Sequence, residues 1–260
     1  MLKQYKPTLD KLTKIVGKSH VLIDEQDTRH YRQGIRFGEG KVLAVVCPGT
    51  LLEQWQALQT IIEADCVVIM QAANTGLTGG STPYGDEYDR PVIIMSTRRL
   101  QGIQVILDGK QVVCLPGATL DNLERTLKPY NREPHSVIGS SCIGASVLGG
   151  VCNNSGGALV RRGPAYTEMA LYARVNESGE LELINHLGID LGNTAEEILT
   201  RLQKQDYETG QVTTQTTQLA SDNRYAHDVK QVDADSPARF NADPTRLYEA
   251  SGSAGKVCVF

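Results

Sequence analysis

One glycine-rich stretch, residues 70–83 (MQAANTGLTGGSTP), constrains the fold of this chain more than any other feature. It follows an apolar run, residues 66–70, that predicts a short buried strand. It contains Gly76, Gly79 and Gly80, and glycine allows both unusual backbone torsions and the close approach of a ligand to the main chain. Such a loop can direct several backbone N–H groups at one phosphate or pyrophosphate group. We therefore expect an anion-binding loop, with a glycine-rich surface turn as the alternative.

The stretch matches neither of two common nucleotide-binding motifs. It lacks the Gly-Lys-Ser/Thr that closes a P-loop. Pro83, Pro91 and a polar segment follow it, where the dinucleotide fingerprint would open directly into a helix. A regular doubly wound dinucleotide-binding sheet is therefore not predicted.

Length and charge narrow the class of protein. The 260 residues, 40% hydrophobic and 22% charged, suit a globular protein of one large or two small domains. The net charge of −4 and the absence of a basic stripe argue against a nucleic-acid partner. No apolar run is long enough to span a membrane, and the N-terminus lacks the apolar core of a signal peptide. We expect a soluble, cytoplasmic chain.

The cysteines and histidines give no metal-binding pattern. None of the cysteines forms a C-x-x-C pair, and most stand among Val, Ile and Leu, which predicts buried free thiols. The histidines are dispersed at positions without metal-ligand spacing. No metal is therefore expected. The cysteines are Cys47, Cys66, Cys114, Cys142, Cys152 and Cys258.

The first half of the chain predicts helices and strands in alternation. Apolar spacing predicts helices over 9–16 and 24–32, and Thr50 with Glu53 forms a capping box that opens a third. Strands over 41–47 and 67–70 flank that third helix, so we expect a β-α-β unit with a parallel strand pair. Further elements are a strand over 92–95, a hairpin around Asp108-Gly109 and a helix over 119–128. This mixture predicts an α+β fold.

A second stretch of small residues, 138–164 (IGSSCIGASVLGGVCNNSGGALVRRGP), adds to the first. It predicts a short helix over 144–151, whose small residues permit the close approach of a flat ligand. A helix N-terminus near Ser141 would favour an anion. Two neutral stretches rich in Gly, Ser and Asn predict one long ligand that contacts both.

The last part of the chain predicts a hairpin over 167–185, a helix capped by Thr194, and a strand over 257–260. The chain thus ends in what reads as the middle of a strand. We expect a fragment of a longer protein.

With both stretches in view, the chain resembles the FAD-binding domains of the vanillyl-alcohol oxidase and p-cresol methylhydroxylase family, and within it the respiratory, quinone-dependent D-lactate dehydrogenases. The resemblance covers nearly all of the chain. The motifs that carry it are MQAANTGLTGGSTP (70–83), REPHSVIGSSCIGASVLGGVCNNSGG (132–157), RGPAYTEM (162–169), NHLGIDLG (185–192) and SGSAGK (251–256).

The resemblance implies a two-subdomain, α+β FAD-binding domain truncated at its C-terminal side. We expect a helical arm over 1–40 and the FAD-binding domain over 41–260. Its first subdomain would cover about 41–115 and its second, incomplete, about 116–260. The FAD contacts that the resemblance implies are Ala72, Ala73, Asn74, Thr75, Gly76, Gly80 and Ser81 at the pyrophosphate, with Gly139, Ser146, Gly156 and Val259 further along the cofactor.

The implied chemistry is the FAD-dependent oxidation of D-lactate to pyruvate, with electrons passed to a membrane quinone. In the family, the substrate cap, the proposed base and the membrane-contacting surface lie beyond position 260, so no catalytic residue is assigned in this chain. The full-length enzyme would be peripheral on the cytoplasmic side of the cell membrane. Two alternatives stay open: a flavoenzyme for another 2-hydroxy acid such as glycolate, and a truncated FAD-binding module without turnover.

Overall fold

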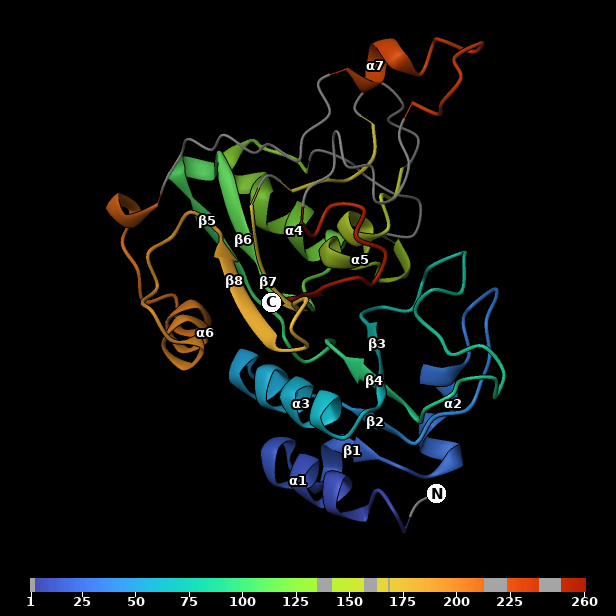
Figure 1. Ribbon diagram of the computed structural model, residues 1–260. Helices are drawn as coiled ribbons and strands as arrows, with labels where there is room; N and C mark the ends of the chain where they lie inside the picture. Colours follow the sequence, from blue (N-terminus) through green and yellow to red (C-terminus); the bar gives the residue numbers. More distant parts are fainter. Residues whose placement is uncertain (1–2, 135–141, 157–162, 168, 213–223, 239–248) are drawn as a thin grey trace. The chain divides into compact units, whose positions relative to one another are not determined.

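The computed structural model describes residues 3–134, 142–156, 163–167, 169–212, 224–238 and 249–260. The chain forms two compact units. The first comprises Met1–Gln101 and Gly192–Gln205, and the second comprises Gly102–Leu191 and Asp206–Phe260. Each unit mixes helices with β-sheet (Figure 1), so the fold is α+β, as the sequence predicted.

The first unit is built on a four-stranded sheet in the order β1-β2-β4-β3. β1 is antiparallel to β2, and both β2 and β3 run parallel to β4. Every residue of β4 is buried, which suits its central place, because a strand covered on both faces reads as a continuous apolar run. The strands are β1 (Val21–Leu22), β2 (Ala44–Val46), β3 (Val67–Gln71) and β4 (Val92–Ser96).

The predicted direct pairing of the two strands around the third helix is wrong. β2 and β3 are parallel, but β4 lies between them and pairs with both. The strand that follows the glycine-rich loop is more completely buried than β3, so it takes the position that removes most apolar surface from water. β1, a short strand within the predicted helical arm, was also not expected.

The helices of the first unit agree with their sequence signals. Thr50 Oγ1 accepts the N–H of Glu53 at 3.1 Å, and the Glu53 carboxylate accepts the N–H of Gly49 at 2.6 Å. Thr194 caps its helix in the same way through Glu197 N–H at 3.2 Å. α3 packs against both α1 and α6. The helices are α1 (Lys6–Val16), α2 (Glu25–Arg32), α3 (Leu51–Glu63) and α6 (Ala195–Lys204), with a 3₁₀ turn at Lys18–His20.

α2 is fixed to the sheet by an apolar cluster. Val45, Ile94 and Ile69 lie in register on neighbouring strands, and Tyr31 of α2 packs with them. This contact holds the C-terminal turn of α2 in place, and that turn carries the carbonyl groups discussed below.

The second unit contains a two-stranded hairpin, β5-β6, and a three-stranded antiparallel sheet in the order β8-β7-β9. Both predicted hairpins are confirmed. The strands are β5 (Ile103–Ile106), β6 (Gln111–Cys114), β7 (Ala170–Val175), β8 (Leu181–His186) and β9 (Cys258–Val259). The helices are α4 (Leu120–Leu127), α5 (Val147–Cys152) and α7 (Tyr225–Asp228), with 3₁₀ turns at Leu107–Gly109, Lys128–Tyr130 and Thr209–Gln211.

The helix predicted over 144–151 starts later than expected. α5 begins at Val147, and Ser146 caps it by accepting the N–H of Gly149 at 2.9 Å. The prediction of an N-terminus near Ser141 is therefore wrong, and Ser141 itself lies outside the described residues. Several serines precede this helix, and each could have served as its cap.

Candidate functional site

The glycine-rich loop leaves β3 at the carboxyl end of a parallel pair, the edge at which open α/β sheets bind ligands. Among the described residues, no protein group accepts a hydrogen bond from the backbone N–H of Ala72, Ala73, Thr75, Gly76 or Gly80. Asn74 has a φ of 55°, in the left-handed region, and Gly79 has a φ of 73°. Consecutive unpaired N–H groups on such a turn are donors for an anion.

Two side-chain amides close the neck of this loop. Gln71 is 2% exposed, and its Nε2 donates to the carbonyl oxygens of both Ser81, at 2.6 Å, and Tyr31, at 2.7 Å. Asn74 Nδ2 donates to the carbonyl oxygen of Gln33 at 2.8 Å, while Asn74 Oδ1 accepts the hydroxyl of Ser81 at 2.9 Å. The side chains of Asn74 and Ser81 are therefore engaged within the protein, and the backbone N–H groups of the loop remain as donors for a ligand.

Apart from Ser81 O, the carbonyls that accept hydrogen bonds from these amides belong to the C-terminal end of α2. The last carbonyl groups of a helix have no partner within the helix. Here Arg32 O accepts Gly40 N–H at 3.3 Å, and Tyr31 O and Gln33 O accept the loop amides. The glycine-rich loop thus caps α2, and α2 in turn holds the loop.

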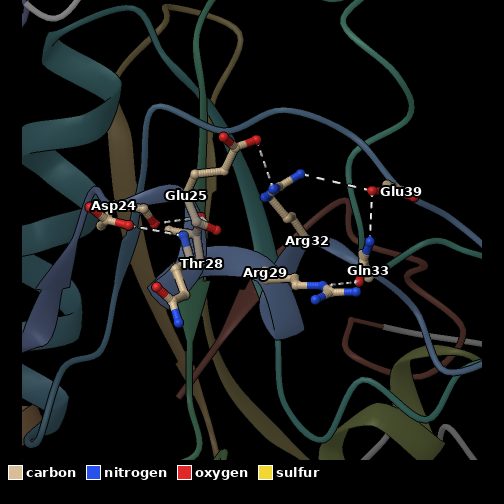
Figure 2. A network of polar contacts seen from close by, with 8 residues as sticks. Asp24, Glu25, Thr28, Arg29, Arg32, Gln33 and Glu39 are labelled. Carbon is tan, nitrogen blue, oxygen red and sulfur yellow. Dashed lines mark hydrogen bonds and ion pairs between the residues drawn. The ribbon is translucent and has the colours of Figure 1, made fainter.

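A polar network supports the same turn from the solvent side (Figure 2). Arg32, with a side chain 14% exposed, pairs with Glu25 at 3.1 Å and with Glu39 at 3.9 Å. Glu39 also accepts Gln33 Nε2 at 2.7 Å, and Arg29 donates to Gln33 Oε1 at 3.3 Å. Gln33 is therefore fixed through its side chain by Arg29 and Glu39, while its carbonyl oxygen receives Asn74.

The loop has room for a ligand at its glycines. Among the described residues, a Cβ built on Gly76 would meet no atom within 4 Å, and one on Gly80 would meet only Thr78 Oγ1, at 3.8 Å. Unpaired donors and uncrowded glycines fit the requirements of a diphosphate, which needs many N–H groups and close access to the backbone. The predicted residues Ala72, Ala73, Asn74, Thr75, Gly76, Gly80 and Ser81 all belong to this one loop.

Of the residues predicted in the second unit, Ser146 and Gly156 lie on either side of α5 in the sequence. Ser146 is 4% exposed and is used as the helix cap. Gly156, beyond the helix, is exposed, and a Cβ there would meet none of the described atoms within 4 Å. Val259 pairs with Tyr172 of β7. Gly139 lies outside the described residues.

The segment before β9 lies beside α5 (Figure 1), and two main-chain hydrogen bonds join them. Gly252 N–H donates to Val151 O, and Ala254 N–H donates to Cys152 O, each at 2.9 Å. On the same helix exit, Asn154 has a φ of 51° and a buried Oδ1 that no described group donates to. An orphaned acceptor next to the open Gly156 also fits a polar ligand.

Tyr31, Cys114 and Cys152 are not poised for acid–base or nucleophilic work, because burial raises their pKa values far above neutral pH. Burial raises the pKa of Tyr31 to about 12, and its phenol oxygen accepts the thiol of Cys47 at 3.8 Å. Burial also raises the pKa of Cys114 to about 12 and that of Cys152 to about 11. All six cysteines are free, as predicted. Cys47, Cys66 and Cys258 are buried, as also predicted, but Cys114 and Cys152 are only partly buried and Cys142 is exposed. Within the described ranges, no three His, Cys, Asp or Glu side chains gather as a metal site would require.

Sequence reasoning missed Gln71, Tyr31 and Gln33. A polar Gln71 at the end of an otherwise apolar strand was the available signal, since a buried amide requires partners. Tyr31 and Gln33 act through main-chain carbonyls, which every residue has, so the sequence carried no signal for them.

Comparisons with known proteins agree with this geometry. The chain is 61% identical over 252 residues to the quinone-dependent D-lactate dehydrogenase of Haemophilus influenzae, covering 97% of this chain and 44% of that protein. It is 57% identical over 255 residues to the Escherichia coli protein of the same name, covering 98% of this chain and 44% of that protein. The chain therefore spans less than half the length of these curated relatives.

Solved structures share the fold at low identity. p-Cresol methylhydroxylase with substrate bound matches with a TM-score of 0.58 and 17% identity, over 74% of this chain and 37% of that one. An alkyldihydroxyacetonephosphate synthase matches with a TM-score of 0.57 and 14% identity, over 75% and 37%. The FAD binding domain family model matches residues 42–182, more than half of the chain. With its two-unit α+β fold of the p-cresol methylhydroxylase type, the chain belongs to the FAD binding domain family, and its cofactor is FAD.

Proposed function

We propose that this chain supplies the FAD-binding part of a quinone-dependent D-lactate dehydrogenase, which oxidises D-lactate to pyruvate. The observation that carries the proposal is 61% identity to a protein of that name across almost the whole chain. Identity of 49% to the protein of the same name from Corynebacterium glutamicum, again over 97% of this chain, supports the same reading.

The cofactor and the protein divide the work. Bound FAD supplies a hydride acceptor, which no amino-acid side chain provides. The residues of this chain bind and orient the cofactor. In the first unit, the unpaired N–H groups of residues 72–80 would hold the diphosphate, and in the second unit Ser146, Gly156 and Val259, with Gly139, would contact the remainder. No residue of this chain is assigned as the base.

We propose that the full-length protein passes the electrons to a membrane quinone and works at the cytoplasmic face of the cell membrane. No helix among the described residues is both long and apolar enough to cross a bilayer. We propose that the full-length protein contacts the membrane peripherally, through regions outside this chain. No nucleic-acid partner is proposed.

A second candidate is an FAD-binding module that has no turnover by itself. The observation that favours it is the coverage of only 44% of each curated relative. An enzyme for another 2-hydroxy acid, such as glycolate, is the remaining alternative.

The test has two steps. The purified chain is mixed with FAD, the excess is removed, and the visible absorption spectrum is recorded; a retained flavin spectrum is expected. Dye reduction is then measured with D-lactate, L-lactate and glycolate, using this chain and a version extended to the relatives' full length. We expect D-lactate-dependent reduction by the extended version alone. Preference for glycolate would overturn the substrate, and turnover by the short chain would overturn the need for the missing part.

A further inference from the structure

We propose that Gln71 and Asn74 are positioning residues for FAD. Their side-chain amides bind the glycine-rich loop to the C-terminal carbonyl groups of α2, so the backbone of residues 72–80 already has its shape when the cofactor binds. The inference rests on FAD binding through this loop. It extends the cofactor site to α2 and to residues that do not themselves touch the ligand.

The first argument is the burial of Gln71. A side-chain amide that is 2% exposed would cost about 1–3 kcal/mol if it were left unpaired. Both N–H groups of Gln71 Nε2 donate hydrogen bonds. One goes to Ser81 O in the loop and the other to Tyr31 O in α2. One side chain therefore fixes the end of the loop to the helix.

The second argument is that Asn74, three residues after Gln71, also joins the loop to α2 through its side-chain amide. Its Nδ2 donates to Gln33 O at 2.8 Å and, more distantly, to His30 O at 3.5 Å. Its Oδ1 accepts the hydroxyl of Ser81 at 2.9 Å. The two amides thus reach three different carbonyls at the end of one helix, and both are also bound to Ser81.

The third argument concerns which groups are left over. The hydrogen bonds made by the side chains of Gln71 and Asn74 use none of the backbone N–H groups of residues 72–80. Those groups stay available to a ligand, and their positions are already set. Preorganisation of this kind raises affinity because less conformational entropy is lost on binding.

The ion-pair network of α2 in turn supports the turn whose carbonyl groups accept these amides (Figure 2). Glu25 and Glu39 hold Arg32, and Glu39 also holds Gln33, whose carbonyl receives Asn74. Tyr31 is anchored in the apolar cluster of the sheet. The two residues whose carbonyl groups bind the loop are therefore both fixed: Tyr31 by apolar packing, and Gln33 by its side-chain hydrogen bonds.

The experiment compares Gln71→Met and Asn74→Gly with Thr50→Ala as the matched control. Met keeps the length of Gln without its donors, and Gly accepts the left-handed backbone of residue 74. Thr50→Ala removes a helix cap in the same unit at a cost of about 1 kcal/mol, and the hydroxyl that it removes bonds Glu53 N–H of α3. For each variant of the whole chain, the dissociation constants for FAD and for riboflavin, which lacks the diphosphate, are measured by fluorescence titration.

We expect the dissociation constant for FAD to rise about ten-fold in each loop variant, while that for riboflavin and that of the control stay within two-fold. Unchanged FAD affinity in Asn74→Gly and in any folded Gln71→Met would overturn the inference and leave the proposed function standing. An equal loss in Thr50→Ala would also overturn it, since the effect would then be general destabilisation. A wild-type chain that retains no FAD would overturn both.

Discussion

The ring of Phe37 lies so close to Gly79 that a Cβ on that glycine would come within 2.8 Å of the ring's Cδ1. Gly38 also lies close to the loop, since a Cβ built on Gly38 would lie 3.2 Å from the Cα of Gly79. The turn after α2 and the glycine-rich loop therefore pack backbone against backbone, under the exposed ring of Phe37. Of the loop's glycines, Gly79 thus faces the protein, whereas a Cβ on Gly76 would meet none of the described atoms within 4 Å.

Gly38→Ala should be severely destabilising. Its φ is 93°, and a Cβ there would lie 2.0 Å from Thr82 Oγ1, which itself bonds Gly79 O at 3.0 Å. The backbone strain alone costs about 1–2 kcal/mol, and displacing Thr82 adds the loss of a hydrogen bond, about 1 kcal/mol more. The free energy of unfolding in urea measures this cost.

Gly179→Ala is the matched control, because its φ is 81° and a Cβ would meet nothing within 4 Å. It should lose only the strain contribution. Equal losses in the two variants would show that the packing of Gly38 on the loop contributes nothing to stability.

Gly76→Ala should separate cofactor contact from folding. Its φ lies outside the left-handed region and its added methyl group would meet no protein atom, so stability should change by less than about 0.5 kcal/mol. A methyl group between the backbone and a bound diphosphate would raise the dissociation constant for FAD by about ten-fold. Gly210→Ala, with the same freedom, is the control and should leave FAD affinity unchanged. Unaltered affinity in Gly76→Ala would remove Gly76 from the proposed contacts.

The local parts of this structure were readable from the sequence, and the long-range parts were not. Thr50 and Thr194 predicted the starts of their helices correctly, because a capping residue and the N–H group that it accepts lie only three residues apart. Gln71 meets Tyr31 across 40 positions and Asn74 meets Gln33 across 41, through carbonyls that have no signature in sequence. The insertion of β4 between β2 and β3 was missed for the same reason, since strand order depends on relative burial across the whole sheet.

Thr50→Ala should reduce the free energy of unfolding by about 1 kcal/mol, because it leaves the N–H of Glu53 without its cap. Thr126→Ala is the contrasting variant. Thr126 lies within α4, and its hydroxyl only returns a bond to Asn122 O at 2.8 Å, so alanine should be neutral or slightly stabilising there. Chemical denaturation of both variants checks the pair. A cost at Thr126 equal to that at Thr50 would contradict the capping role.

Cys114 should make the stability of the chain depend on pH above about 9. Burial raises the pKa of its thiol from 9.0 in the ordinary state to about 12 in the fold. Because the folded state holds this proton more tightly, its contribution is complete below pH 9 and is lost as the pH rises toward 12. Between those values one such group reduces the free energy of unfolding by about 1.4 kcal/mol per pH unit.

Urea denaturation under reducing conditions, repeated from pH 7.5 to 10.5, measures this slope. Cys114→Ala should lose some stability at neutral pH and then decline less steeply than the wild type, so the two curves converge as the pH rises. Val112→Ala, in the same strand and without a titratable group, should stay parallel to the wild type, because it removes packing and no proton. Parallel curves for Cys114→Ala as well would mean that this thiol ionises alike in the folded and unfolded chain. The alkaline loss of stability would then be assigned to Cys152, whose pKa burial raises to about 11, and to the half-buried phenols of Tyr31 and Tyr207, whose pKa values burial raises to about 12.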